Sequence, residues 1–185
     1  MRWILLCLLL LAGSVVAAPK PAPLEFSDPE GDVAADREKF TWIDVVRVTA
    51  ERAGTQKVEL NIDFADPLPQ STTSELNVDL FFDLDRKTET GELFWGIGHD
   101  LFLCLYLNKG DRKWQASQLL KSDYARAHLI EVETVQVAKR RLCVVLRCKS
   151  WKEAAAFDLI VRPREKQTDL DQAPDQEKGA FKIDL

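Results

Sequence analysis

The sequence predicts an all-β protein, an antiparallel β-sandwich of jelly-roll-like form with one short helical turn. Two observations carry this prediction. Apolar and polar residues alternate over several short segments, which is the pattern of strands with one buried face. Helical periodicity is confined to one short stretch, so strands have to supply nearly all of the layers around the core.

Residues 1–18 have the layout of a secretory signal peptide. Arg2 supplies a charged start, an apolar run follows from Trp3 to Leu11, and Ala17 and Ala18 precede Pro19 as a small-residue cleavage site. The apolar run is shorter than the roughly 20 residues that a membrane-spanning helix needs. We therefore expect a protein that is exported to the periplasm or the extracellular space, with no membrane span.

The remainder of the chain is predicted to be an extended Pro-rich leader, residues 19–24, and a single sandwich domain, residues 25–185. The formal net charge of −5 gives no broad electrostatic attraction to nucleic acid or to anionic lipid. Three cysteines lie in predicted strands, where buried free thiols are favoured. A bridge from Cys104 to Cys143 or Cys148 is the alternative in an oxidising compartment.

The predicted strands follow one another along the domain at 43–48, 57–64, 76–85, 100–107, 113–119, 128–137, 142–148, 157–162 and 180–184. A tight turn at 108–111 joins two of them. The helical turn is expected at 150–157, because Ser150 and Glu153 have capping-box spacing and Ala154 follows with good helix propensity.

Several segments resemble one known group of modules. Residues 79–107 contain Asp83-Leu84-Asp85, a Thr-x-Thr-Gly turn that ends at Gly91 and a glycine-rich return to Asp100. The chain also has DPEGD at 28–32 and DQAPD at 171–175. In this order the segments resemble the DOMON-like β-sandwich group, which includes family 9 carbohydrate-binding modules and the C-terminal binding modules of secreted glucan-active enzymes. The resemblance covers nearly all of the predicted domain, and it implies a sandwich fold and carbohydrate as ligand.

Aromatic residues carry the prediction of a sugar site, because sugar rings pack their C–H faces on aromatic rings while placed polar groups read the hydroxyls. Trp42 and Trp151 are expected in or beside the core, and a structural role at the end of the sandwich is as plausible for Trp95 as a binding role. The predicted ligand-binding residues are Phe94 and Trp95 in the glycine-flanked loop, Trp114 and Tyr124 near strand ends, and Asp100.

A metal site is predicted where the first and last strands approach one another. Carboxylates precede both strands, and oxygen ligands suit Ca²⁺, which the resemblance also implies as a structural ion. Two solvated acidic loops would give the same sequence pattern. The predicted ligands are Asp28, Asp32, Asp171 and Asp175.

The loop that begins at Asp83 does not match an EF-hand, because Lys87 and Thr88 occupy its fifth and sixth positions and a glutamate is missing at its twelfth. Hydrogen bonds from the Thr88 and Thr90 hydroxyls to the aspartates would shape this loop without a metal.

Haem is not expected, because the sole methionine is Met1 and the two histidines would have to be the axial pair. The sequence also lacks the motifs of nucleophilic hydrolases and zinc proteases, so an enzyme is not expected. We predict an exported, monomeric, non-catalytic binding module for carbohydrate. The alternative is a structural or protein-interaction domain of the cell envelope that has no sugar site.

Overall fold

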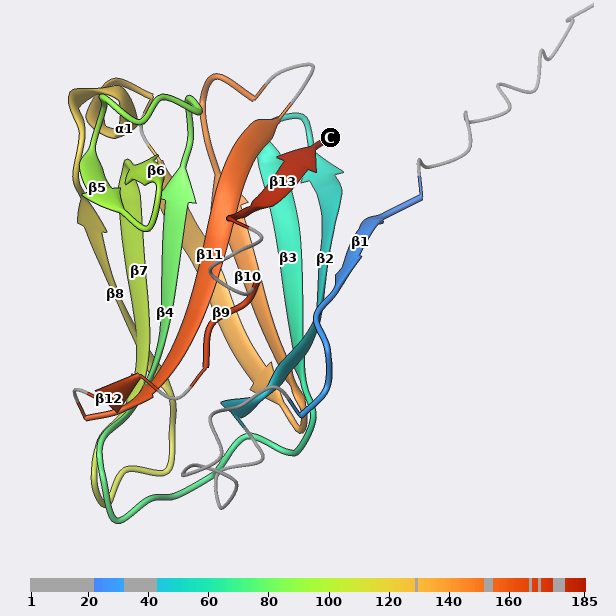
Figure 1. Cartoon of the computed structure of the whole chain (residues 1–185), viewed down its shortest axis with the longest axis vertical. Helices are drawn as coiled ribbons and strands as arrows, with labels where there is room; N and C mark the ends of the chain where they lie inside the picture. The colour runs from blue at the N-terminus through green and yellow to red at the C-terminus, as the bar shows by residue number, and fades with distance from the viewer. Residues whose placement is uncertain are drawn as a thin grey trace, which may run out of the picture.

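A computed structural model describes residues 22–31, 43–128, 130–151, 155–166, 168–169, 171–174 and 179–185. The fold is an all-β sandwich, as the sequence predicts, and its two large antiparallel sheets face each other across one core (Figure 1). Within these ranges no helix is long and apolar enough to cross a membrane.

Strand pairing builds the two sheets in a fixed order. Sheet A runs β1 (Leu24–Ser27), β2 (Val45–Gly54), β3 (Lys57–Phe64), β10 (Arg141–Arg147), β9 (Glu131–Ala138). Sheet B runs β12 (Thr168–Asp169), β11 (Ala156–Glu165), β4 (Leu76–Asp83), β7 (Leu101–Leu107), β8 (Gln115–Leu120), and β13 (Phe181–Asp184) also pairs with β11. A separate hairpin, β5 (Glu92–Phe94) with β6 (Ile97–His99), lies against the outer side of sheet B (Figure 1).

Period-2 alternation places the core between the sheets. On β7, Leu103 and Leu105 are fully buried in the main core, while Phe102 and Cys104 are half-buried on the opposite, outer face. Trp151 is also buried and stacks on Phe157 at 5.3 Å between ring centroids, so it is a core residue as the sequence predicts. Trp42 lies outside the described residues.

The predicted strands are all present, with shifts of a few residues at their ends, but short elements were missed. Strand β1 begins at Leu24, the last residue of the predicted leader, and pairs with Ala50 of β2. The β5–β6 hairpin lies inside a segment that the sequence analysis treated as a loop. Short strands depend on tertiary contacts more than on their own periodicity, so the sequence signal for them is weak.

The described helix lies where the sequence does not predict one. The described helix, α1, is Asp123–Ala127, and the Ser122 side chain caps it by accepting a hydrogen bond from the Ala125 N–H at 3.1 Å. At the predicted position, Ala156 and Phe157 belong to β11 and pair with β13, while residues 152–154 lie outside the described residues. Strand pairing overrides the helix propensity of Ala156.

Cys104, Cys143 and Cys148 are free thiols, as the sequence analysis favoured, although of the three Cys148 alone is fully buried. Cys104 and Cys143 lie on the outward faces of β7 and β10, whereas Cys148 is fully buried in the core. Because the first two face away from the core on different sheets, they cannot form a bridge. Burial raises the pKa of the Cys104 thiol to about 12, and the nearby Asp79 carboxylate adds to this rise.

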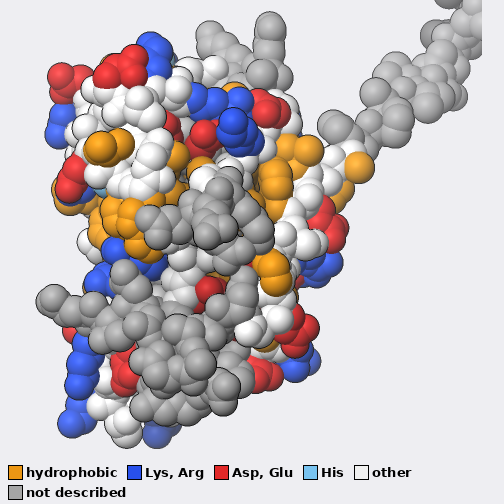
Figure 2. Space-filling view, viewed as in Figure 1, with side chains coloured by type: hydrophobic (Ala, Val, Ile, Leu, Met, Phe, Trp, Pro, Cys, Tyr) orange, Lys and Arg blue, Asp and Glu red, His pale blue; other side chains and the backbone are white. Residues whose placement is uncertain are grey.

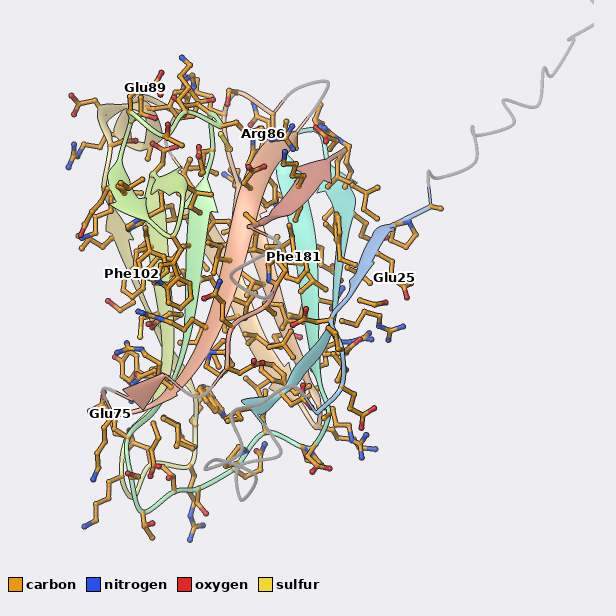
Figure 3. The ribbon with its side chains drawn as sticks, in the orientation of Figure 1. Glu25, Glu75, Arg86, Glu89, Phe102 and Phe181 are labelled. Atoms are coloured by element: carbon orange, nitrogen blue, oxygen red, sulfur yellow. The ribbon has the colours of Figure 1, made fainter. Side chains whose placement is uncertain are left out.

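Arg86 ties the loop after β4 to the last strand. Its guanidinium lies 2.9 Å from the Asp158 carboxylate on β11 and 2.8 Å from the Asp184 carboxylate on β13, and it donates to the Ile183 carbonyl oxygen (Figure 3). Arg86 therefore has a structural role in this loop.

A row of charges crosses the outer face of sheet A. Asp63 of β3 pairs in register with Arg47 of β2 and Arg141 of β10, and its carboxylate accepts hydrogen bonds at 2.7 Å from Arg47 and at 2.6 Å from Arg141. Burial alone would raise the pKa of the Asp63 carboxyl, but these two guanidinium groups more than offset that effect and lower the pKa. The ion pairs therefore stabilise the fold with Asp63 charged.

We expect Asp63→Asn to lower the free energy of unfolding by about 1–3 kcal/mol at pH 7, because both guanidinium groups lose their charged partner. The wild type contains a carboxyl whose pKa is lowered on folding, so its advantage is present above the ordinary Asp pKa of about 4 and shrinks as the pH falls below it. Urea denaturation between pH 7 and pH 2 measures this. Asp66→Asn is the control, since the Asp66–Arg140 pair is exposed and 3.6 Å apart, and it should change stability by less than about 0.5 kcal/mol.

Candidate functional site

The outer face of sheet B carries polar and aromatic side chains that are buried although they face away from the main core. Strand β4 is buried along its whole length on both faces, although a strand at the surface of a sandwich normally exposes one face. The outward side chains of β4 are Asn77, Asp79, Phe81 and Asp83, and each of them is at most 4 % exposed. Neighbouring strands and the β5–β6 hairpin provide the groups that cover or pair with them.

An aromatic stack covers Phe81. The ring of Phe94 from the hairpin lies parallel to that of Phe81 with centroids 4.0 Å apart, and the Trp95 ring stacks on Phe94 at 4.7 Å. Phe102 of β7, the in-register partner of Phe81, packs beside it at 5.1 Å. Figure 3 shows Phe102 beside the hairpin, and Figure 2 shows hydrophobic side chains gathered at this place on the surface.

Arg162 joins the aromatic stack to a buried acid. Its guanidinium carbon lies 4.9 Å from the ring centroid of Phe81, 4.8 Å from that of Phe94 and 5.9 Å from that of Trp95. The same guanidinium pairs at 3.0 Å with Asp79, which is fully buried and lies 2.6 Å from the Nε of Arg164. Cation–π contact and ion pairing together fix the orientation of the Arg162 side chain.

The backbone holds Trp95 in a costly conformation. Trp95 and Gly96 are the two residues between β5 and β6, and both have positive φ, 43° and 86°, as a type I′ hairpin turn requires. Asn and Gly are favoured at such positions, whereas the left-handed region costs other residues about 1–2 kcal/mol. The result is a large, half-buried indole at the tip of a two-residue turn. Strain of this kind is concentrated at functional positions.

His99 is the last residue of β6, and its side chain is buried rather than exposed at a ligand surface. The ring is 3 % exposed and meets Phe81 edge-on at 5.1 Å. Burial lowers the pKa of His99, although Glu92 acts in the opposite direction. A neutral imidazole therefore packs against the aromatic stack.

Asp100 is fully buried and holds the loop above it. Its Oδ2 accepts a hydrogen bond from the Leu84 N–H at 2.8 Å. Burial raises the pKa of the Asp100 carboxyl, although the nearby Ser122 hydroxyl and the Leu84 N–H favour its charged form. This predicted ligand-binding residue thus lies beneath the surface.

The loop after β4 is organised by its own aspartates. Asp83 accepts hydrogen bonds from the Lys87 N–H at 3.2 Å and the Gly98 N–H at 3.3 Å, and Asp85 accepts from the Thr90 hydroxyl at 2.8 Å. The prediction that a threonine hydroxyl shapes this turn is confirmed for Thr90. Burial raises the pKa of Asp83, and repulsion from Asp100 adds to the rise.

Trp114 and Tyr124 lie at other places. Trp114 packs against the main core, and its Nε1 donates to the Pro69 carbonyl oxygen at 3.0 Å. Trp114 lines a groove of about 320 Å³ between β8 and β9, the outermost strands of the two sheets on one side of the sandwich. Tyr124 is on α1, with its ring 4.2 Å from that of His128. Of the predicted aromatic residues, the structure therefore brings together Phe94 and Trp95.

Two of the four predicted metal ligands can be placed. Asp28 lies beside the start of β2, where its N–H donates to the Val46 carbonyl oxygen at 3.1 Å. Asp171 reaches the same strand, since its Oδ2 accepts from the Val45 N–H at 3.1 Å. Asp32 and Asp175 lie outside the described residues, so a calcium site formed by all four carboxylates stays a prediction.

Sequence reasoning missed Asp79, Phe81 and Arg162. A signal was present in the strand periodicity, because all three residues occupy positions that face away from the main core. A charged or large apolar side chain that becomes buried at such a position needs a partner. The periodicity of β4 and β11 placed the three residues on one face. Recognising their contact would have required the pairing of those two strands, which are far apart in sequence.

Comparison of the chain with family models, with curated proteins and with solved structures finds no match. The resemblance to the DOMON-like group therefore stays an expectation from its motifs, and the functional argument depends on the site itself.

The hairpin offers a test of its close packing. A Cβ at Gly91 would lie 2.3 Å from the His99 carbonyl oxygen, whereas a Cβ at Gly96 would meet nothing within 4 Å, and both glycines have positive φ. We expect Gly96→Ala to cost about 1 kcal/mol of unfolding free energy from backbone strain alone. Gly91→Ala adds steric overlap and should cost about 3 kcal/mol or more. Urea denaturation measures both variants, and equal losses would contradict the close packing of the loop on β6.

Proposed function

We propose that the protein is an exported, non-catalytic carbohydrate-binding module whose ligand packs on Trp95. The observation that carries this proposal is the half-buried indole of Trp95, stacked on Phe94 and beside the guanidinium of Arg162. An aromatic face next to an oriented hydrogen-bond donor is the combination that recognises a sugar ring and its hydroxyls. The secretory layout of residues 1–18 supports export.

The rigidity of this site favours recognition. Phe94 is held against Phe81, and the Asp79 carboxylate fixes Arg162, so neither the platform nor the donor has to be ordered when a ligand binds. Preorganisation lowers the entropic cost of binding, which is important for sugars because they compete with water for every hydrogen bond. The backbone strain at Trp95 is consistent with an aromatic side chain retained for binding.

A second candidate is a protein-interaction domain of the cell envelope. Two large apolar side chains are strongly exposed among the described residues, Leu93 at 70 % on the hairpin and Leu119 at 51 % on the edge strand β8. Apolar groups of this kind favour contact with another protein surface. Leu93 and Leu119 are single exposed residues, however, whereas Phe94 and Arg162 both lie against the Trp95 ring. Carbohydrate is therefore the preferred ligand.

The test is Trp95→Ala, with Leu93→Ala as a matched control from the same hairpin. Native affinity gels containing laminarin, barley β-glucan, xylan or starch identify a retaining polysaccharide, and titration calorimetry with its oligosaccharides then gives the affinity. We expect Trp95→Ala to weaken binding about tenfold or more and Trp95→Phe to weaken it less, while Leu93→Ala binds like the wild type. Circular dichroism verifies that each variant is folded.

Two results would count against the proposal. If no polysaccharide retains the wild type, the interaction domain becomes the better description of the protein. If a polysaccharide retains Trp95→Ala and the wild type equally, carbohydrate binding stands but its site is elsewhere, and the Trp114 groove is the next place to examine.

A further inference from the structure

The side of the sandwich between β8 and β9 leaves core-facing residues open to solvent. β8 is an edge strand of sheet B and β9 is an edge strand of sheet A, and in the described ladders each pairs with a single neighbour. Val132, Val135 and Val137 of β9 pair in register with three core residues of β10, so they face the core, yet they are only half-buried. On β8, Ala116 and Gln118 pair in register with two core leucines of β7 and are exposed. The core is therefore open along this side of the described structure.

A continuous groove follows this opening. The groove of about 320 Å³ between β8 and β9 continues into a second hollow of about 490 Å³, because Trp114 and Val135 line both. Arg112 and Lys113 line the second hollow. Consecutive residues of β9, Val132–Ala138, line the two hollows together, which we call the β8–β9 groove. Seven residues of a strand span about 20 Å, so the groove has the length for an extended chain of about six residues.

The edge of β9 directs backbone groups into the groove. The Val132 N–H donates at 3.2 Å to Oε1 of Gln118, across the gap between the two sheets. The amide oxygen of Gln118 accepts here as the carbonyl oxygen of a paired strand would. Open strand edges take up extended peptides by strand addition. We propose that the β8–β9 groove binds an extended peptide with acidic side chains, which pairs with β9 as an added strand. The proposal does not depend on carbohydrate binding at Trp95.

The charges around the groove favour an acidic peptide. Arg112 and Lys113 are exposed, and neither forms an ion pair with another described residue. The one carboxylate beside them in sequence, Asp111, accepts hydrogen bonds from two side-chain amides, so the three residues together leave one positive charge. In the other part of the groove the Glu133 carboxylate is neutralised by Lys57 at 2.7 Å. An acidic side chain near Arg112 and Lys113 is therefore attracted, whereas a basic one is repelled.

The floor of the groove suits alternate apolar side chains. An added strand shares the pleat of β9, so every second side chain of the peptide faces the half-buried valines and Trp114. The Trp114 Nε1 already donates to the Pro69 carbonyl oxygen, and this is the only donor of an indole. The ring therefore offers a ligand its apolar surface in a fixed orientation. A peptide strand can satisfy the apolar floor, the strand edge and the two cations together.

The experiment measures binding of synthetic heptapeptides with blocked ends to the purified protein by fluorescence anisotropy. In these peptides Val alternates with Thr, and Asp replaces the two Thr residues nearest one end or the other, with Lys in the same positions as the comparison. We expect one acidic peptide to bind with a Kd of about 100 μM or below and its Lys counterpart to bind at least about tenfold more weakly. Lys113→Gln should weaken the acidic peptide about threefold or more. Lys149→Gln is the matched control, since it removes the same charge from an exposed position outside the groove and should leave the affinity unchanged.

Two further peptides test the strand pairing. Successive N–H groups of a strand point to opposite edges, so we N-methylate the acidic peptide at its odd or at its even positions. At least one of the two methylated peptides should bind about tenfold more weakly than the parent, because it can no longer donate to β9.

Two outcomes would overturn the proposal. In the first, neither acidic peptide binds at concentrations up to about 1 mM, and sedimentation of the wild type as a dimer would then identify a second copy as the occupant of the groove. In the second, both methylated peptides bind as tightly as the parent, so that strand addition does not occur. Neither result bears on polysaccharide retention at the Trp95 site.

Discussion

The burial of β4 on both faces is the constraint on which the rest of the structure depends. A central strand of a two-layer sandwich has one face for the core, and here its other face is covered as well. Every outward side chain of β4 therefore needs a partner that compensates for lost water. Arg162 and Arg164 provide it for Asp79, and the aromatic stack covers Phe81. The hairpin and the loop before it are consequences of this requirement.

These partners divide the outer face of sheet B into two regions with different chemistry. Hydrogen bonds from backbone N–H groups hold the acidic end, where Asp83 and Asp100 fix the loop geometry. Ring contacts hold the aromatic region, where the indole of Trp95 is left half-exposed. The hydrogen bonds of the acidic end fix the loop after β4, and the ring contacts of the aromatic region leave one side of the Trp95 indole exposed.

Much of the fold was accessible from the sequence because its long strands alternate cleanly. On β7 and β10 the leucines all fall on the face that packs in the core, and periodicity places Leu103 and Leu142 there. Short elements escaped because their stability comes from contacts elsewhere in the chain. The hairpin depends on Phe81, and Ala156 is recruited by pairing with β13, whereas α1 has only five residues and is capped locally by Ser122.

The candidate site was only partly accessible for a related reason. Trp95 could be picked out from local sequence alone, because it is a large aromatic residue in a loop flanked by glycines. Arg162 and Asp79 meet only because β11 pairs with β4, and such pairing between distant segments is not encoded in any local pattern. The loop that begins at Asp83 was compared only with a continuous metal-binding loop, so Asp100, which follows the hairpin, was not considered together with Asp83 and Asp85.

The hairpin that carries Trp95 pairs only with itself in the strand ladders. β5 and β6 form a two-stranded sheet of their own, joined to the sandwich through ring stacking and through contacts at the hairpin's base such as the Gly98 N–H to Asp83. A substitution or a change of length at the hairpin tip therefore leaves the ladders of both large sheets intact. Among descendants of this chain, the exposed surface can diverge quickly while the scaffold is retained, and the same tip is the natural place to graft a new recognition loop.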